Sequence, residues 1–421
     1  MAATVAKVAA WPLVKLRRIT SKIGSGATPK GGKESYKEGG ITLIRSLNVY
    51  DFEFDYEGLA FIDEEQAKQL ANVEVCAEDI LLNITGASVA RCCMVPKRIL
   101  PARVNQHVSI VRIDRVLADP SYVLYCLNSP RYKQHLLTIA QGGATREALT
   151  KEKIGNFEIP LPRIQEQRKI AAILSAYDDL IENNLRRIQI LDEMAQLIYR
   201  EWFVNFRFPR HEGVRMIDSE TGRIPEGWEV RRLGELVDIV KGRKAHSLYH
   251  AINADRVPYL LIDGLRNGKY VYSDKNAGPN AKEGDVLMVM DGASSGEVFI
   301  GFSGVIGSTL AIFRPRNVTL LSPYVLFLMF RERKREIAVK NVGAAIPHAN
   351  KAYITGIELT VPPKDVSMTL HSQLQPFFQQ MIMLRLKNAN LRQTRDLLLP
   401  KLISGKLDVS ELDIDIGEEP A

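Results

Sequence analysis

The most regular pattern in the sequence is a stripe of apolar residues between Arg163 and Phe203, a stretch that contains neither Gly nor Pro. Apolar residues recur there at alternating steps of four and three, which is the spacing of a coiled coil. The stripe consists of Ile170, Leu174, Tyr177, Ile181, Ile188, Leu191, Ala195, Ile198 and Trp202, interrupted by Asn184. A helix of about 40 residues is roughly 60 Å long. Because so narrow a stripe cannot bury itself, the sequence predicts a second helix that covers it.

A second stretch with the same spacing runs from Gln375 to Leu399. Its stripe consists of Phe377, Met381, Leu384, Asn388, Leu391 and Leu398. Pro376 suits the first helical turn, and Pro400 is expected to end the helix. Asn388, like Asn184, is a lone polar residue in an apolar stripe. Such an Asn either fixes the register of a helix pair at a cost in stability or occupies a tolerated, partly exposed position.

The chain also repeats itself, which predicts two copies of one structural plan. The matched segments are Trp11–Leu16 with Trp228–Leu233, Glu78–Ser88 with Gly284–Ser294, Val108–Ile113 with Leu310–Pro315, Pro120–Leu127 with Ser322–Met329, and Gly142–Pro162 with Val342–Pro362. Each copy mixes short β-branched runs, bounded by Gly, Asp and Asn, with one or two helical patterns. The predicted fold class is therefore α+β.

These patterns divide the chain into two similar α/β domains separated by two long helices that form an antiparallel coiled coil. The predicted segments are a first domain at 1–162, a central helical region at 163–208, a linker at 209–227, a second domain at 228–363, a C-terminal helical region at 364–408 and an acidic tail at 409–421. The linker has turn residues and charges but no sustained period. The tail is expected to be frayed.

Composition sets wide limits on the function. The chain has 421 residues, of which 46% are apolar and 25% charged, as in an ordinary globular protein of two or three domains. Its net charge of +7 permits a polyanionic partner without demanding one. The four cysteines, Cys76, Cys92, Cys93 and Cys126, lack zinc-like spacing and are expected to be free thiols in a reducing cytosol. No apolar run approaches 18 residues and no signal peptide opens the sequence, so we expect a cytoplasmic protein.

Three segments resemble the specificity subunit of type I restriction-modification systems: Ile159–Phe203, Gly227–Gly242 and Asn390–Leu407. The resemblance implies that the two globular copies are target-recognition domains, each of which reads one half of a split, asymmetric site in double-stranded DNA. The long helices resemble the family's spacer regions, which set the gap between the half-sites. One departure is that Leu370–Pro376 lacks the PxxEQ-like opening present at Pro162–Gln167.

In that family the specificity subunit has no active site of its own. It docks two methyltransferase (modification) subunits, and restriction/translocase subunits join them. The resemblance therefore implies that the assembled complex is an adenine-N6 DNA methyltransferase and an ATP-dependent endonuclease. S-adenosylmethionine, ATP and Mg are expected on the partner subunits, with no cofactor, metal or catalytic residue in this chain.

Candidate DNA-contacting residues are polar or basic side chains in loops next to strands, where recognition residues tend to lie. In the first copy they are Lys30, Lys33, Arg45, Asn48, Asn105, Gln106, His107, Gln141, Thr145 and Arg146. In the second copy they are Lys241, Arg243, Lys244, Arg266, Ser308, Thr309, His348 and Asn350. A solvated surface side chain is the alternative explanation for each of them.

Searches for catalytic motifs find none that fits. The run Val361–Lys364 has the wrong first and last residues for the tetrad of amino-methyltransferases, and Gly24–Pro29 begins like GxGxxG but ends in Pro. Neither a GxxxxGK[ST] loop nor an HExxH motif occurs. Two other functions stay open: a single-chain modification enzyme with an unrecognised catalytic domain, and a coiled-coil scaffold without DNA readout.

The coiled-coil pattern generates a first prediction. Inserting four residues after Asn184 should lengthen the helix by about 6 Å and widen the gap between the half-sites by roughly one to two base pairs. Both half-site sequences should be unchanged. Mapping of methylated sites measures the gap, and an unaltered gap would contradict the prediction.

Overall fold

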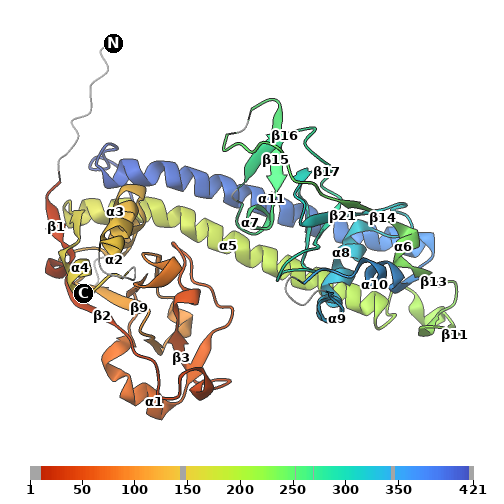
Figure 1. Cartoon of the computed structure of the whole chain (residues 1–421), viewed down its shortest axis with the longest axis horizontal. Coiled ribbons are helices and arrows are strands. Elements are labelled where there is room, and N and C mark those ends of the chain that lie inside the picture. The colour runs from red at the N-terminus through yellow and green to blue at the C-terminus, as the bar shows by residue number, and fades with distance from the viewer. Residues whose placement is uncertain (1–10, 143–147, 252, 269, 343–346, 417–421) are drawn as a thin grey trace. The chain divides into compact units, whose positions relative to one another are not determined.

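The computed structural model of the chain describes residues 11–142, 148–251, 253–268, 270–342 and 347–416 (Figure 1). The chain divides into two compact units. Unit 1 combines residues 1–181 with 390–421, and unit 2 consists of residues 182–389. Each unit therefore takes part of both predicted long helices, a division that the sequence segments above do not have.

Unit 1 is built on two four-stranded sheets and a short strand pair. The first sheet has the order β2 (Thr20–Ser25), β9 (Val108–Ile113), β6 (Ile80–Asn83), β7 (Cys92–Met94) and is antiparallel throughout. The second sheet has the order β4 (Ala60–Ile62), β3 (Ile41–Ile44), β8 (Ala102–Val104), β5 (Glu74–Val75), in which β3 and β8 are parallel. The pair consists of β1 (Leu13–Lys15) and β10 (Glu158–Pro160).

Unit 2 repeats this arrangement strand for strand. Its first sheet has the order β14 (Val237–Lys241), β21 (Leu310–Pro315), β18 (Val286–Val289), β19 (Val298–Ile300). Its second sheet has the order β16 (Val271–Asp274), β15 (Arg256–Leu260), β20 (Gly304–Ile306), β17 (Asn280–Ala281), again with one parallel pair, β15 and β20. The strand pair is β13 (Glu229–Arg232) with β22 (Glu358–Val361). The predicted repeat is confirmed.

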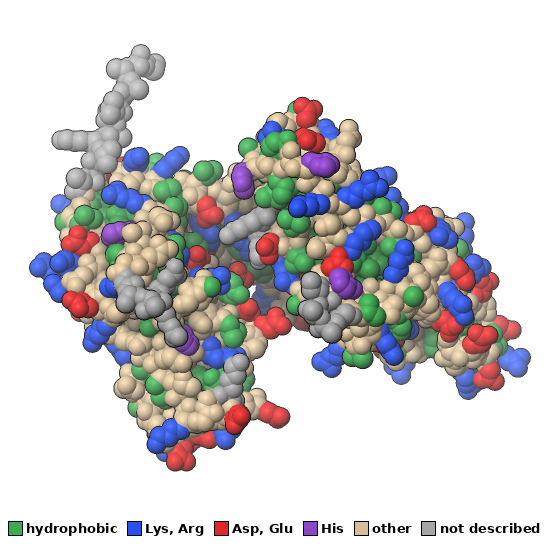
Figure 2. Space-filling view, in the orientation of Figure 1, with side chains coloured by type: hydrophobic (Ala, Val, Ile, Leu, Met, Phe, Trp, Pro, Cys, Tyr) green, Lys and Arg blue, Asp and Glu red, His purple; other side chains and the backbone are tan. Residues whose placement is uncertain are grey.

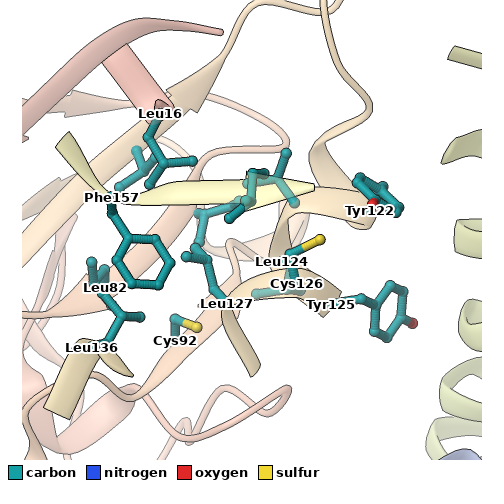
Figure 3. Close-up of a cluster of buried hydrophobic side chains, with 14 of the residues drawn as sticks. Leu16, Leu82, Cys92, Tyr122, Leu124, Tyr125, Cys126, Leu127, Leu136 and Phe157 are labelled. Atoms are coloured by element: carbon teal, nitrogen blue, oxygen red, sulfur yellow. The ribbon is translucent and has the colours of Figure 1, made fainter. Parts of the chain in front are cut away.

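Three short helices of unit 1, α2 (Pro120–Asn128), α3 (Pro130–Gln141) and α4 (Lys151–Asn156), occupy the same places in the element order as α8 (Pro323–Glu332), α9 (Lys334–Val339) and α10 (Lys351–Gly356) of unit 2. The remaining short helices differ: α1 (Glu64–Gln69) follows β4 in unit 1, whereas α6 (Leu233–Leu236) follows β13 and α7 (Ile262–Asn267) precedes β16 in unit 2. Pro opens both α2 and α8, where its missing N–H has no helical partner to lose. The helix α2 packs on β7, and Phe157, Leu82 and Leu136 gather beside it in the core of unit 1 (Figure 3).

The four cysteines are free thiols, as predicted. Cys92, Cys93 and Cys126 are buried, and Cys76 is exposed. Burial raises the pKa of Cys92 to about 12, because the thiolate is poorly solvated in the core. These buried cysteines therefore act as small apolar side chains.

A partly buried ion pair is repeated in the first sheet of each unit. Arg112 on β9 donates from Nε and Nη2 to Asp79 at 2.7 and 2.8 Å. Arg314 on β21 makes the same bidentate pair with Asp285, at 2.7 and 2.5 Å. Each carboxylate is buried and also accepts a backbone N–H, from Cys76 and Lys282 respectively. Both oxygens of each buried carboxylate thus accept hydrogen bonds, which limits the free-energy cost of removing the charge from water.

The two long helices are α5 (Ile164–Phe203) and α11 (Lys364–Ile403). In unit 1, Ile170 and Leu174 near the start of α5 share a core with Leu399 and Leu402 near the end of α11. In unit 2 the end of α5 shares a core with the start of α11, through residues that include Tyr199 and Leu374. The helices therefore pair antiparallel in both units, as predicted.

The two asparagines of the apolar stripes meet in unit 2. Asn184 Nδ2 donates to Asn388 Oδ1 at 2.8 Å, and Asn388 is 2% exposed. Because only one register satisfies both amides in this way, the contact favours the interpretation that the asparagines fix register.

Contrary to the expectation from the sequence, the two prolines of α11 do not mark its ends. The helix begins at Lys364, where the predicted C-terminal helical region begins, and continues through Pro376 and Pro400 to Ile403. Both prolines lie on the exposed side of the helix, where water can bond to the carbonyl that each proline leaves without an N–H partner. The opposite side, with Leu370, Leu374 and Phe378 buried, holds the helix together through packing.

The linker and the tail are more ordered than predicted. Within 209–227, β11 (Met216–Ser219) and β12 (Gly222–Pro225) form a hairpin, for which Gly222 adopts a φ of 109°. The hairpin is too short for its period to be recognised in the sequence. In the tail, Val409 is 2% exposed and belongs to the core of unit 1, because it covers apolar residues at the end of α11.

Two glycines allow a close approach at the ends of the first strands. A Cβ on Gly26, just after β2, would overlap the carbonyl oxygen of Val104. A Cβ on Gly242, just after β14, would overlap the carbonyl oxygen of Gly307. The loops that follow these glycines are thereby held against the connection between β8 and β9 in unit 1, and between β20 and β21 in unit 2.

The close approach predicts a selective effect of alanine substitution. Gly26→Ala should destabilise the full chain by roughly 1–3 kcal/mol, because the obstructing atom is backbone and cannot rotate away. Gly24→Ala, two residues earlier, is the matched control, since no atom lies within 4 Å of its added Cβ. Urea unfolding measures both variants, and equal midpoints would contradict the prediction.

Candidate nucleic-acid interface

The candidate interface of each unit is built around a repeated Gly-Ala-Ser turn. In unit 1 the turn Gly86–Ser88 follows β6, and in unit 2 Gly292, Ala293 and Ser294 follow β18. Gly86 and Gly292 have φ values of 74° and 98°, a region that favours glycine. The turns are therefore specified by sequence at the same point of both copies.

Backbone hydrogen bonds bring the same two segments to both turns. In unit 1, Ile84 N–H donates to His107 at 3.0 Å and its carbonyl accepts from Leu149 at 2.9 Å. In unit 2, Met290 N–H donates to Thr309 and its carbonyl accepts from Ala349, both at 2.7 Å. In unit 1, the loops before β9 and α4 thus meet at the end of β6. In unit 2, the loops before β21 and α10 meet at the end of β18. The loop after Gly26 or Gly242 lies beside them.

In unit 1 these loops contribute a chain of neutral polar side chains. Thr28 Oγ1 donates to Gln106 Oε1, and the Gln106 amide donates to His107 Nε2 at 3.2 Å. Because Nε2 accepts, Nδ1 carries the proton of the neutral ring and donates to Thr85 Oγ1 at 2.7 Å. The cluster can therefore offer both donors and acceptors to a ligand.

In unit 2 the equivalent place is occupied by charged side chains. Lys241 Nζ donates to Asp291 Oδ2 at 2.6 Å, and His348 Nδ1 donates to Asp291 Oδ1 at 2.8 Å. Burial alone would raise the pKa of Asp291, but the hydrogen bonds and charges of Lys241 and His348 outweigh it, so the pKa lies below its ordinary value. Asp291 is therefore a carboxylate at neutral pH.

An arginine flanks the turn on its other side. In unit 2, Arg266 donates to Ser294 Oγ at 2.8 Å and pairs with Glu297. In unit 1, the Arg91 guanidinium lies 4.8 Å from the centre of the Tyr50 ring, a cation–π distance. Lys and Arg are interspersed with Asp and Glu over the visible face of each unit (Figure 2). The clusters are therefore defined by their local side-chain contacts.

The structure brings together some of the predicted residues, namely Gln106 and His107 in unit 1 and Lys241, Arg266, Thr309 and His348 in unit 2. Lys30, Gln141, Arg243, Lys244 and Ser308 are exposed in or beside loops. The side chain of Lys33 and all of Thr145 and Arg146 lie outside the described residues. Contact with DNA stays a prediction for each residue of the set.

Four predicted residues have local structural partners. Asn48 is fully buried and donates to the carbonyls of Asp55 and Glu57, and buried Asn105 accepts from the N–H of His107. Asn350 caps α10 by accepting from Tyr353 N–H at 3.0 Å. Arg45 donates to the Gly58 carbonyl. Each of the three asparagine side chains therefore holds nearby backbone in place.

Thr85, Asp291, Arg91 and Tyr50 were missed by the sequence analysis. The prediction covers basic and neutral polar side chains, so it leaves out the carboxylate of Asp291. The signal that could have found it is the repeat itself, since Thr85 and Asp291 directly precede the two Gly-Ala-Ser turns.

Other possible sites in the described part of the chain offer less chemistry. A cavity of about 560 Å³ in unit 2 is lined by residues that include Phe203, Met329 and Leu359. Among its charged lining residues, Glu332 is paired with Arg200 and Glu336 with Arg333. Among the residues that the structure describes, no group of three His, Cys, Asp or Glu could hold a metal ion, and no helix is long and apolar enough to cross a membrane.

Comparison with known families identifies the scaffold that carries these clusters. Residues 11–192 and 225–394 each match the type I restriction modification DNA specificity domain. The chain belongs to this family. The two matches of the specificity domain correspond to the two copies of the repeat, and each includes one Gly-Ala-Ser turn with the strand before it.

Known relatives of this specificity family cover most of the chain. The type I restriction enzyme MjaIX specificity subunit of Methanocaldococcus jannaschii is 26% identical over 96% of this chain and 94% of its own length. The EcoBI specificity subunit of Escherichia coli is 32% identical over 37% of this chain and 33% of its own length. The crystal structure of a type I restriction-modification S subunit from M. genitalium shares the fold, with a TM-score of 0.56, 15% identity, and coverage of 95% of this chain and 98% of that chain.

The charged cluster of unit 2 predicts a small, pH-dependent stabilisation. Because the pKa of Asp291 is lowered on folding, its pairs stabilise the protein above pH 3.8, the ordinary carboxyl value, and are lost as pH falls through the lowered folded value. Asp291→Asn should cost less than about 1 kcal/mol near neutral pH, and the difference from wild type should vanish in acid. Unfolding curves between pH 7 and pH 3 measure it, and a difference that grows in acid would contradict it.

Proposed function

We propose that this chain is the DNA-recognition subunit of a type I restriction-modification complex. Each unit reads one half of a bipartite, asymmetric DNA site, and the two long helices, each shared by both units, set the number of base pairs between the halves. The chain itself carries out no chemistry.

The observation that carries this proposal is the pair of equivalent loop clusters with different side chains. The position just before the Gly-Ala-Ser turn is Thr85 in unit 1 and Asp291 in unit 2. An isolated antiparallel β-bridge pairs Thr85 with Ala148 and Asp291 with His348. Different donors and acceptors on one scaffold are what two readers of different base sequences need, because sequence is read by hydrogen bonds to base edges.

Partner subunits supply the chemistry in this proposal. Two methyltransferase subunits carry S-adenosylmethionine, and restriction/translocase subunits carry ATP and Mg. Exposed apolar residues on α5 support protein docking, since Ile190, Met194 and Leu197 are 48%, 43% and 60% exposed. Their steps of four and three place them on one side of the helix.

Sequencing of methylated DNA from cells with and without the gene tests the proposal. We expect one bipartite motif to disappear with the gene, and to return when it is restored. The purified chain with DNA and S-adenosylmethionine should transfer no methyl groups. Methylation by the chain alone would favour the single-chain enzyme, and an unchanged methylome would favour a scaffold without DNA readout.

A substitution in unit 1 tests the assignment of one cluster to one half-site. His107→Ala removes the central member of the Thr28–Gln106–His107–Thr85 chain and should relax base preference in a single half-site by roughly tenfold or more. The other half-site and the gap should be unchanged. His135→Ala, an exposed histidine on α3 of the same unit, is the matched control. Unchanged methylation motifs in His107→Ala would exclude this cluster as the reading surface.

A further inference from the structure

We propose that Lys241 and Asp291 act together as a specificity-determining pair that reads one C·G base pair in the half-site of unit 2. The inference rests on the proposed function, and it names the base pair that Lys241 and Asp291 recognise. The carboxylate of Asp291 accepts from the cytosine N4 amino group, and the ammonium of Lys241 donates to guanine O6 and N7.

The spacing of the two side-chain groups matches the edge of that base pair. Lys241 Nζ and Asp291 Oδ2 are 2.6 Å apart, which places a donor and an acceptor side by side. In the major groove a C·G pair presents N4 as a donor and O6 as an acceptor. These two atoms are themselves hydrogen-bonded and lie about 2.9 Å apart. The protein pair and the base pair are therefore complementary in both charge and spacing.

The other base pairs fit less well. An A·T pair also places a donor, adenine N6, beside an acceptor, thymine O4, but the carboxylate would then lie next to the N7 acceptor and the ammonium next to the thymine methyl. On a C·G pair, guanine offers O6 and N7 to the three donors of the ammonium, and cytosine has no acceptor beside N4 in this groove. A G·C pair in the opposite orientation would place the acceptor O6 of guanine against the Asp291 carboxylate, and the donor N4 of cytosine against the Lys241 ammonium.

The pair is both accessible and held in place. The side chains of Lys241 and Asp291 are 49% and 29% exposed. Asp291 is fixed by its position before Gly292, by the backbone bridge to His348 and by the hydrogen bond from His348 Nδ1. Because His348 occupies Oδ1, the carboxylate is oriented with Oδ2 toward Lys241. Such an arrangement limits the reorganisation that binding requires.

Unit 1 gives an internal contrast. Thr85 stands at the position of Asp291, and its partner His107 is held by the neutral Gln106 amide. A hydroxyl and an imidazole both donate and accept, so this position lacks the fixed donor–acceptor polarity of the Lys241–Asp291 pair. The proposal therefore concerns the half-site of unit 2 alone.

The test uses the full chain assembled with its methyltransferase subunits, and a library of DNA duplexes in which the second half-site is randomised. Wild type should methylate duplexes with C·G at one position of that half-site. Asp291→Asn should lower the preference for C·G there by roughly tenfold or more and raise methylation of A·T, because Asn pairs with adenine N6 and N7. Lys241→Met should relax the same position.

Asp238→Asn is the matched control, since Asp238 lies at the other end of β14 and forms an exposed pair with Arg316. It should leave both half-sites unchanged. The proposal is overturned if the wild-type half-site of unit 2 has no preferred C·G pair. It is also overturned if Asp291→Asn and Lys241→Met change different positions, or lower methylation of all duplexes equally. If Asp291→Asn does not fold, Lys241→Met decides alone. Sequence-independent methylation by wild type would instead refute the proposed function itself.

Discussion

A helix of 40 residues with a narrow apolar stripe cannot bury that stripe alone, and the rest of the fold depends on how this constraint is met. The helix α5 obtains its cover from α11, a segment from the far end of the chain. The start of α5 uses the end of α11 in the core of unit 1, and the end of α5 uses the start of α11 in the core of unit 2. Both long helices therefore belong to the hydrophobic core of each unit.

The duplicated scaffold separates structural from variable positions. The Asp79–Arg112 and Asp285–Arg314 pairs, the Gly-Ala-Ser turns and the close approaches at Gly26 and Gly242 recur in both copies. The side chains presented at the ends of the central strands do not recur, since one cluster is neutral and the other is charged. A shared frame with different side chains at its loops lets one fold serve two recognition tasks.

Most of the architecture could be predicted from the sequence, because periodicity and repetition are properties of sequence alone. The stripe from Ile170 to Trp202 and the repeat around Glu78–Ser88 gave the helix pair and the two copies. The continuation of α11 through Pro376 and Pro400 could not be predicted, because an exposed proline within a helix is tolerated only when packing on the opposite side holds the helix, and packing is a tertiary property. The hairpin β11–β12 is too short to show a period.

The candidate clusters were less predictable, since loop geometry decides which polar side chains are free. Asn48, Asn105 and Asn350 have side chains suited to base recognition, yet each holds nearby backbone. Asp291 became visible only through its contacts with Lys241 and His348. Residue type alone does not distinguish a side chain that supports a loop from one that a ligand can reach.

The composition of unit 1 has a consequence for biosynthesis. Its core includes Leu399, Leu402, Ile403 and Val409, which a ribosome adds only after all of unit 2 has been made. Unit 1 begins first during translation but completes its hydrophobic core last. Unit 2 has all of its residues once the ribosome has added residue 389. In a nascent chain, the apolar surface that unit 1 buries against these later residues is exposed, and therefore prone to aggregation, until the residues after 389 have been joined.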